Sequence, residues 1–83
     1  MPRLRDAELR LLVRERIEDA RLPVMAPKQI TASGGSGHMC VVCDQPIRSD
    51  QVEYEFADHR DGKRLCFHLG CHAVWQIECA RGP

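Results

Sequence analysis

Two short stretches decide the fold of this chain: Cys40-Val-Val-Cys43 and, further along, Phe67-His68-Leu-Gly-Cys71. Two cysteines separated by two residues can both reach one ion from a single tight turn, at bond lengths of about 2.3 Å. His68 and Cys71 are three positions apart, so both side chains point the same way on the first turn of a helix. Together the two pairs predict a closed four-donor site, and we expect it to hold one structural Zn²⁺ ion.

Two alternatives to this ligand set follow from the same residues. A redox dithiol has the spacing of Cys40 and Cys43, but it needs a nucleophilic cysteine at a helix start within a strand-helix-strand unit, and the pattern lacks such a unit. Cys66, two positions before His68, is an alternative fourth ligand in place of that histidine. The sequence favours the zinc site and leaves the choice between Cys66 and His68 open.

The remaining histidines and the last cysteine have simpler interpretations. His38 and His59 fall in expected loops, where we assign them no metal-binding role, and His72 is expected to be a solvated helix residue. Cys79 shares a helix face with Cys71, so we expect it to be packed in the interior.

Length and composition point to a small domain that needs help to fold. The chain has 83 residues, with 5 cysteines and 4 histidines but few aromatic side chains, and chains of this size often depend on a metal, a disulfide or a partner. The N-terminus shows no apolar stretch typical of a signal peptide, and no run approaches membrane-spanning length. We therefore expect a cytoplasmic, reducing environment, in which clustered cysteines hold metal.

The chain divides into three expected parts: an N-terminal amphipathic helix (1–22), a Pro/Gly/Ser-rich linker (23–39) and a zinc-binding domain (40–83). In the first part Leu9, Val13 and Ile17 recur at helical spacing. Within the linker, residues 34–39 read equally well as a natural glycine loop or as a cloning junction, and the sequence leaves both open.

A hairpin and a helix are expected after the first cysteine pair. Val52, Tyr54 and Phe56 alternate with glutamates, which predicts a strand with those three side chains facing the core. Asp61-Gly62 suits a turn with positive backbone angles. A second strand over 63–67 and a helix over 68–80 complete the pattern.

The expected C-terminal helix carries apolar residues on two sides. One stripe, which should face the knuckle and hairpin, contains Cys71, Trp75 and Cys79. The other stripe, on nearly the opposite side, contains Leu69, Ala73, Ile77 and Ala80. Because both sides need covering, we expect the N-terminal helix or another protein to bury the second stripe.

The order of knuckle, hairpin and ligands on a helix start resembles that of the treble-clef zinc fingers over residues 40 to about 80. The element Phe67-His68-x-x-Cys71, with Trp75 behind it, is similar to the second ligand pair of a LIM-type module, although the second module of a LIM domain is absent. With Cys66 added, the cysteines also match the opening ligands of a RING pattern, whose closing cysteine pairs are missing. The chain is similar in style to short uncharacterised bacterial zinc proteins. The resemblance implies a small α+β, treble-clef-like zinc finger with an N-terminal amphipathic helix.

The expected function is that of a non-catalytic adaptor or regulatory module. Four protein donors leave no position for an activated water, so we expect no enzymatic activity. A protein partner would contact either the N-terminal stripe of Leu9, Val13 and Ile17 or the helix face of Leu69, Ala73 and Ile77. A homodimer is compatible with the same surfaces.

Nucleic-acid binding in transcription is the alternative function. Its best support is a basic group formed by Arg48, Arg60, Lys63 and Arg64. The 12 basic and 12 acidic side chains of the chain cancel, however, whereas a nucleic-acid binder usually concentrates basic residues on one face. We therefore expect protein interaction ahead of nucleic-acid binding.

Overall fold

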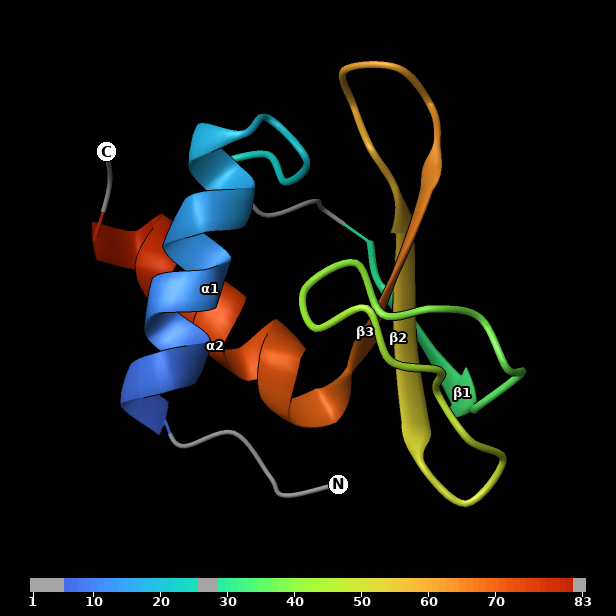
Figure 1. Ribbon diagram of the computed structural model, residues 1–83. Coiled ribbons are helices and arrows are strands. Elements are labelled where there is room, and N and C mark those ends of the chain that lie inside the picture. Colours follow the sequence, from blue (N-terminus) through green and yellow to red (C-terminus); the bar gives the residue numbers. More distant parts are fainter. Residues whose placement is uncertain (1–5, 26–28, 82–83) are drawn as a thin grey trace.

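Two helices and one antiparallel sheet form the described part of the chain, which confirms the α+β class (Figure 1). The computed structural model describes residues 6–25 and 29–81, so the expected helical residues 1–5, the linker residues 26–28 and residues 82–83 lie outside it. The elements in chain order are α1 (Asp6–Glu18), β1 (Thr31–Gly34), β2 (Val52–Ala57), β3 (Arg64–His68) and α2 (Leu69–Arg81).

The β2–β3 hairpin agrees with the expected strands to within a residue at each end. The strands pair antiparallel with Tyr54 opposite Phe67, and Gly62 in the connecting turn has a φ of 74°. The strand's alternation places Tyr54 and Phe56 toward α2, but Val52 is exposed and Glu53 is buried. The expectation that Val52 faces the core was therefore wrong, because Val52 precedes the first β2–β3 pair, Glu53 with His68, and lies at the exposed end of the hairpin. Glu53 is buried because the loop at Ser36 covers its side of β2.

A third strand, β1, lies within the segment expected to be only a linker. Its four residues are exposed and pair antiparallel with β2, so the sheet has the order β1-β2-β3. Gly35 follows it and donates a backbone hydrogen bond to the Gln51 carbonyl at 2.9 Å. A Cβ at position 35 would lie 1.9 Å from the backbone oxygen of Arg48. Only glycine allows this close approach, so the glycine-rich segment has a structural role.

Stacked aromatic rings join the sheet to α2. The Trp75 ring lies 5.1 Å from the Phe56 ring and 5.2 Å from the Phe67 ring, centroid to centroid. The fully buried Trp75 indole donates a hydrogen bond through Nε1 to the Pro23 carbonyl at 2.9 Å. This bond holds the chain after α1 against α2, because a buried indole N–H requires an acceptor.

Helix α1 ends earlier than residue 22, in a left-handed turn. Ala20 has a φ of 62° and donates a backbone hydrogen bond to the Ile17 carbonyl, while the amide of Arg21 reaches the Arg16 carbonyl at 2.8 Å. These two bonds form the Schellman arrangement that commonly ends helices. The expected helix over 1–22 therefore stops at Glu18, before Pro23 is reached.

Helix α1 packs against α2 and not against the strands, whereas α2 contacts both α1 and the sheet (Figure 1). Leu9 and Val13 are buried at this contact, and Arg14 forms an ion pair with the buried Glu78 at 3.3 Å. The helix thus folds back on its own chain.

The contact lies on a different side of α2 from the expected one. Leu69 and Ile77 are 52% and 43% exposed, and Ala73 is also exposed. Of the two expected coverings of this stripe, the N-terminal helix and another protein, the first is wrong, because α1 docks on the side of Val74 and Glu78. In the described part of the chain the stripe of Leu69, Ala73 and Ile77 remains open.

Candidate metal centre

The first cysteine pair lies on a tight loop closed by its own backbone. The Cys40 amide donates to the Gln45 carbonyl at 2.9 Å, and the Asp44 amide donates to the Cys40 carbonyl at 3.0 Å. Asp44 has a left-handed φ of 57°, which turns the chain after Cys43. Both thiols therefore project from one turn, as the two-residue spacing predicts.

The second pair comes from the junction of β3 and α2. His68 is the last residue of β3, and Cys71 lies in the first turn of α2. The Nδ1 atom of His68 lies 3.3 Å from Cys43 Sγ and 4.0 Å from Cys71 Sγ, while its Nε2 atom lies 3.2 Å from the Pro46 carbonyl oxygen. A carbonyl oxygen can only accept, so Nε2 carries the hydrogen and Nδ1 presents its lone pair to the sulfurs.

The donor atoms of Cys40, Cys43, His68 and Cys71 all lie within 4.8 Å of one another. Three thiols at this separation do not ionise independently. A hydrogen bond from the Cys71 thiol lowers the pKa of Cys40 to about 4, whereas burial, followed by the charge of Cys40, raises the pKa of Cys43. Ionisation of one thiol therefore disfavours ionisation of the next, whereas a cation among the sulfurs would stabilise all of the thiolates at once. The four residues could coordinate one metal ion.

Cys66 lies outside this four-donor cluster. Its thiol is buried near Glu53 and His38, in a second group of three donors. Burial, with the nearby carboxylates, raises the pKa of Cys66 to about 11. Of the two alternatives that the sequence left open, the structure brings His68 and not Cys66 to the other cysteines.

His72 is buried, which contradicts its expected position in solvent. Its ring stacks on Tyr54 with 4.6 Å between the centroids and lies edge-on to Phe67. Burial lowers the pKa of His72, which favours the neutral ring. His59 lies exposed at the hairpin tip and Cys79 is half-buried, and neither belongs to the metal cluster.

Charged contacts fasten α1 to the cysteine loop, and sequence reasoning missed them. The Arg16 guanidinium donates through Nε to the Val42 carbonyl at 3.1 Å and through another nitrogen to Asp44 at 3.0 Å. Arg21 pairs with the same carboxylate at 2.8 Å. These groups are far apart in the sequence and have no motif, so only the fold could reveal that α1 and the loop are one unit.

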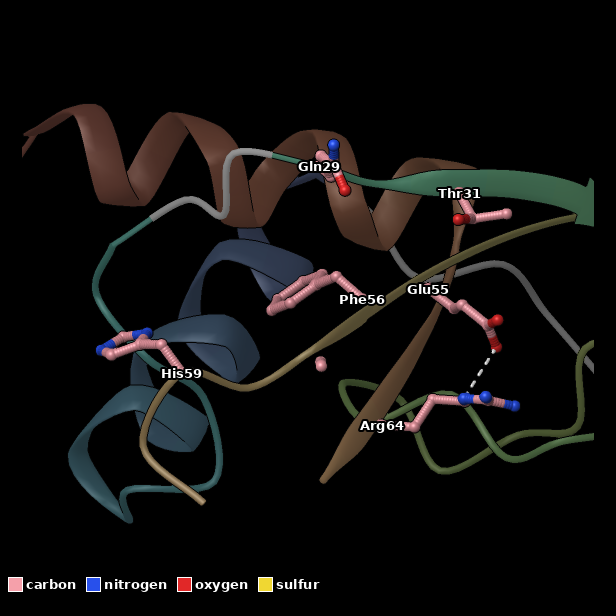
Figure 2. A pocket seen from close by; sticks show the side chains of 7 residues that line it. Gln29, Thr31, Glu55, Phe56, His59 and Arg64 are labelled. Atoms are coloured by element: carbon pink, nitrogen blue, oxygen red, sulfur yellow. Dashed lines mark ion pairs between the residues drawn. The ribbon is translucent and has the colours of Figure 1, made fainter. Parts of the chain in front are cut away.

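A shallow groove lies elsewhere on the molecule, beside β1 and β2 (Figure 2). An ion pair between Arg64 and Glu55 at 3.5 Å spans part of it. Its lining residues are Gln29, Thr31, Glu55, Phe56, Ala57, His59 and Arg64. None of them belongs to the four-donor cluster, so the groove and the metal centre are separate features.

Comparison of the chain with protein-family models, curated proteins and solved structures finds no match. Among the described residues, neither helix is long and apolar enough to cross a membrane. The geometry of the four-donor cluster is therefore the main guide to function.

Proposed function

We propose that Cys40, Cys43, His68 and Cys71 bind one structural zinc ion and that the protein is a non-catalytic zinc module acting by protein–protein interaction. The observation that carries this proposal is the convergence of three sulfurs and one imidazole nitrogen from two separate parts of the chain. Thiolate and imidazole donors in tetrahedral number are the preferred ligands of structural zinc.

The treble-clef assignment rests on how these ligands are placed. One pair lies on a knuckle, and the other spans the junction between the β-hairpin and the helix that follows it. With four protein donors, the ion has no vacant position at which to activate water. Its contribution is then to the folding of the domain.

The pairing of the arginines favours a protein partner over nucleic acid. Six guanidinium groups in the described chain form ion pairs, namely Arg14 with Glu78, Arg16 and Arg21 with Asp44, Arg48 with Asp50, Arg60 with Asp58 and Arg64 with Glu55. Three of them belong to the basic group that would have contacted phosphates. Guanidinium groups that already pair with carboxylates contribute little counterion release on DNA.

The exposed stripe of α2 is the surface that we assign to the protein partner. Leu69, Ala73 and Ile77 lie one turn apart on the side of α2 away from the sheet and α1. An amphipathic helix face of this kind is a common docking element for a groove on another protein. Leu9 and Val13, the other candidate surface, are buried against α2 and unavailable in this conformation.

Metal analysis of the purified full chain tests the zinc assignment. We expect one ion per chain to survive dialysis, and its removal by a strong chelator to abolish the folded near-ultraviolet signal of Trp75. Structural zinc contributes about 10–16 kcal/mol of apparent binding free energy, which is as large as the whole stability of a small domain. Cys43→Ser should unfold the chain, whereas Cys79→Ser, the matched control outside the cluster, should stay folded. A metal-free protein with native spectra would refute the proposal.

The interaction surface needs a separate test. Capture of a host protein should be lost in Ile77→Asp and retained in Gln76→Asp, which places the same charge at the neighbouring exposed position. Equal capture by both variants would contradict the assigned surface. Binding to random duplex DNA tighter than about 10 µM at physiological salt would favour the nucleic-acid function instead.

A further inference from the structure

A second group of three metal-binding side chains lies on the other face of the hairpin from the aromatic core. His38 follows the glycine loop, Glu53 belongs to β2 and Cys66 belongs to β3. One donor atom from each lies within 4.8 Å of the other two. In the β2–β3 pairing Glu53 is opposite His68 and Cys66 is opposite Glu55, so Glu53 and Cys66 are diagonal neighbours on one face of the hairpin. The glycine loop carries His38 to Glu53 on this face.

Glu53 differs from the other buried carboxylates of the protein. Its side chain is 3% exposed, as buried as that of Asp58. The ionisable side chain that faces it among the described residues is the imidazole of His38, at 3.3 Å, and not a guanidinium. Asp58 faces Arg60 and Glu78 faces Arg14. A buried carboxylate normally requires a permanent counter-charge. At Glu53 this place is taken by an imidazole, which carries a charge only when it is protonated, so the site has no permanent counter-charge among the described side chains.

The glycine loop is held to Glu53 by two further bonds. The backbone amide and the hydroxyl of Ser36 both donate to Glu53 Oε1, at 3.0 and 2.9 Å. Oε2 is left to face His38. The carboxylate is thus positioned with one oxygen occupied and the other directed at the histidine.

Serine, histidine and glutamate also occur in nucleophilic relays, but the geometry here differs. The Ser36 hydroxyl and the Glu53 carboxylate both approach Nδ1 of His38. A relay requires the serine and the acid on opposite ring nitrogens, so that one is deprotonated while the other orients the ring. The arrangement is therefore unsuited to activate the serine, whereas three donors converging on one point suit a cation.

We propose that His38, Glu53 and Cys66 form a second metal site, which takes an exchangeable divalent ion of the zinc class. Nitrogen, oxygen and sulfur donors together match zinc or cobalt and not magnesium or calcium, which prefer oxygen alone. Three protein donors leave a coordination position for water or an outside ligand, unlike the four-donor centre. The histidine side chain is 55% exposed, so the ion can enter and leave without unfolding of the domain.

Metal titration of the full chain under reducing conditions tests the proposal. The starting protein is the form that retains its tightly bound ion after dialysis, and elemental analysis defines that baseline. Zn²⁺ is then added in a calorimeter, and Co²⁺ in a parallel absorption experiment, where a thiolate ligand produces sulfur-to-cobalt charge-transfer bands. We expect one additional ion per chain, accompanied by those bands, and no uptake of Mg²⁺.

Two variants with matched controls decide which residues bind the additional ion. His38→Ala and Cys66→Ser should each lower the affinity for the additional ion by at least about tenfold. Losing only a contact that supports a metal ligand already lowers the affinity by about that factor. His59→Ala and Cys79→Ser remove the same residue types outside both clusters and should leave the affinity for the additional ion unchanged. His38 is exposed, so its variant keeps the result interpretable even if Cys66→Ser folds poorly.

Several results would overturn the assignment. They are the absence of an additional ion at saturating Zn²⁺, an additional ion that His38→Ala binds as tightly as the original chain, and cobalt binding without thiolate bands. Loss of the tightly bound ion in Cys66→Ser would place that cysteine in the first centre and also refute the second site. A chain without any ion at the baseline would contradict the structural zinc, and the second site would then be judged from His38→Ala, which should bind one Zn²⁺ ion fewer than the original chain.

Discussion

Asp44 combines two opposed effects, and a substitution series at this residue can separate them. The residue follows Cys43 in the left-handed region, at a φ of 57°, where a Cβ atom costs roughly 1–2 kcal/mol. Its exposed carboxylate accepts from Arg16 and Arg21, and exposed ion pairs contribute about 0.2–1 kcal/mol each. In Asp44→Gly, the gain from relieved backbone strain and the loss of two ion pairs are each about 1 kcal/mol, so the stability should be nearly unchanged.

Asp44→Ala should behave differently from Asp44→Gly. It loses the same ion pairs and keeps a Cβ in the left-handed region. Alanine also lacks the short polar side chain that lets Asp adopt this region more readily than other residues. We expect a loss of about 1–2 kcal/mol in the free energy of unfolding. Arg21→Ala removes one ion pair with no backbone change, and should cost about 0.5 kcal/mol.

Urea unfolding of the chain in the presence of added zinc measures all three variants. The free zinc concentration must be held constant, because an ion that binds only the folded state adds to the apparent stability. If Asp44→Gly is destabilised as much as Asp44→Ala, the left-handed backbone contributes nothing and the reasoning fails. If neither variant changes stability, the contacts from α1 to the cysteine loop are energetically silent.

Three further predictions concern positions outside the four-donor cluster. Ala20→Gly should raise the free energy of unfolding, measured by urea titration, by about 0.5–1 kcal/mol, because glycine adopts the φ of 62° at the helix end without steric strain. A destabilised variant would contradict this account of the helix end. Gly35→Ala should lower it by about 1–3 kcal/mol, since the added Cβ meets backbone that cannot move freely, and an unchanged midpoint would show that the loop adapts. The hydrogen bond from Arg60 holds the pKa of Asp58 below its usual value, so this contribution to stability is complete above the unfolded-state pKa of about 3.9 and is lost as the pH falls through the lower folded-state pKa. Asp58→Asn should therefore be less stable than the original chain at neutral pH, with the difference narrowing in acid; a gap that stays constant from neutral pH to acid would contradict the ion pair.

Sequence patterns predicted the elements whose signals are local. Alternation with Tyr54 and Phe56 predicted the hairpin strand, and Gly62 predicted the turn. The three-residue spacing of His68 and Cys71 predicted a pair at a helix start, although His68 is the last residue of β3 and the helix begins at Leu69. In each case the decisive contacts join residues close in the chain. Local backbone geometry is then enough to determine them.

Other features had no local signal. Strand β1 is exposed and rich in small residues, so its pattern is that of a linker until β2 supplies its hydrogen bonds. Glu53 was expected on a solvated strand face, but the glycine loop covers that face. His72 was expected in solvent, yet its helix position turns it between Tyr54 and Trp75.

The sequence by itself determined that the chain carries two spaced Cys/His pairs, a hairpin between them and a helix with apolar stripes at each end. The tertiary structure decided which faces these elements bury. Helix α1 covers the Val74 and Glu78 side of α2 because Trp75 binds the Pro23 carbonyl and Arg16 binds the cysteine loop, and both contacts join segments far apart in the chain. Such contacts form only after the chain has closed around its core, so periodicity could show that two apolar stripes exist but not which of them stays exposed.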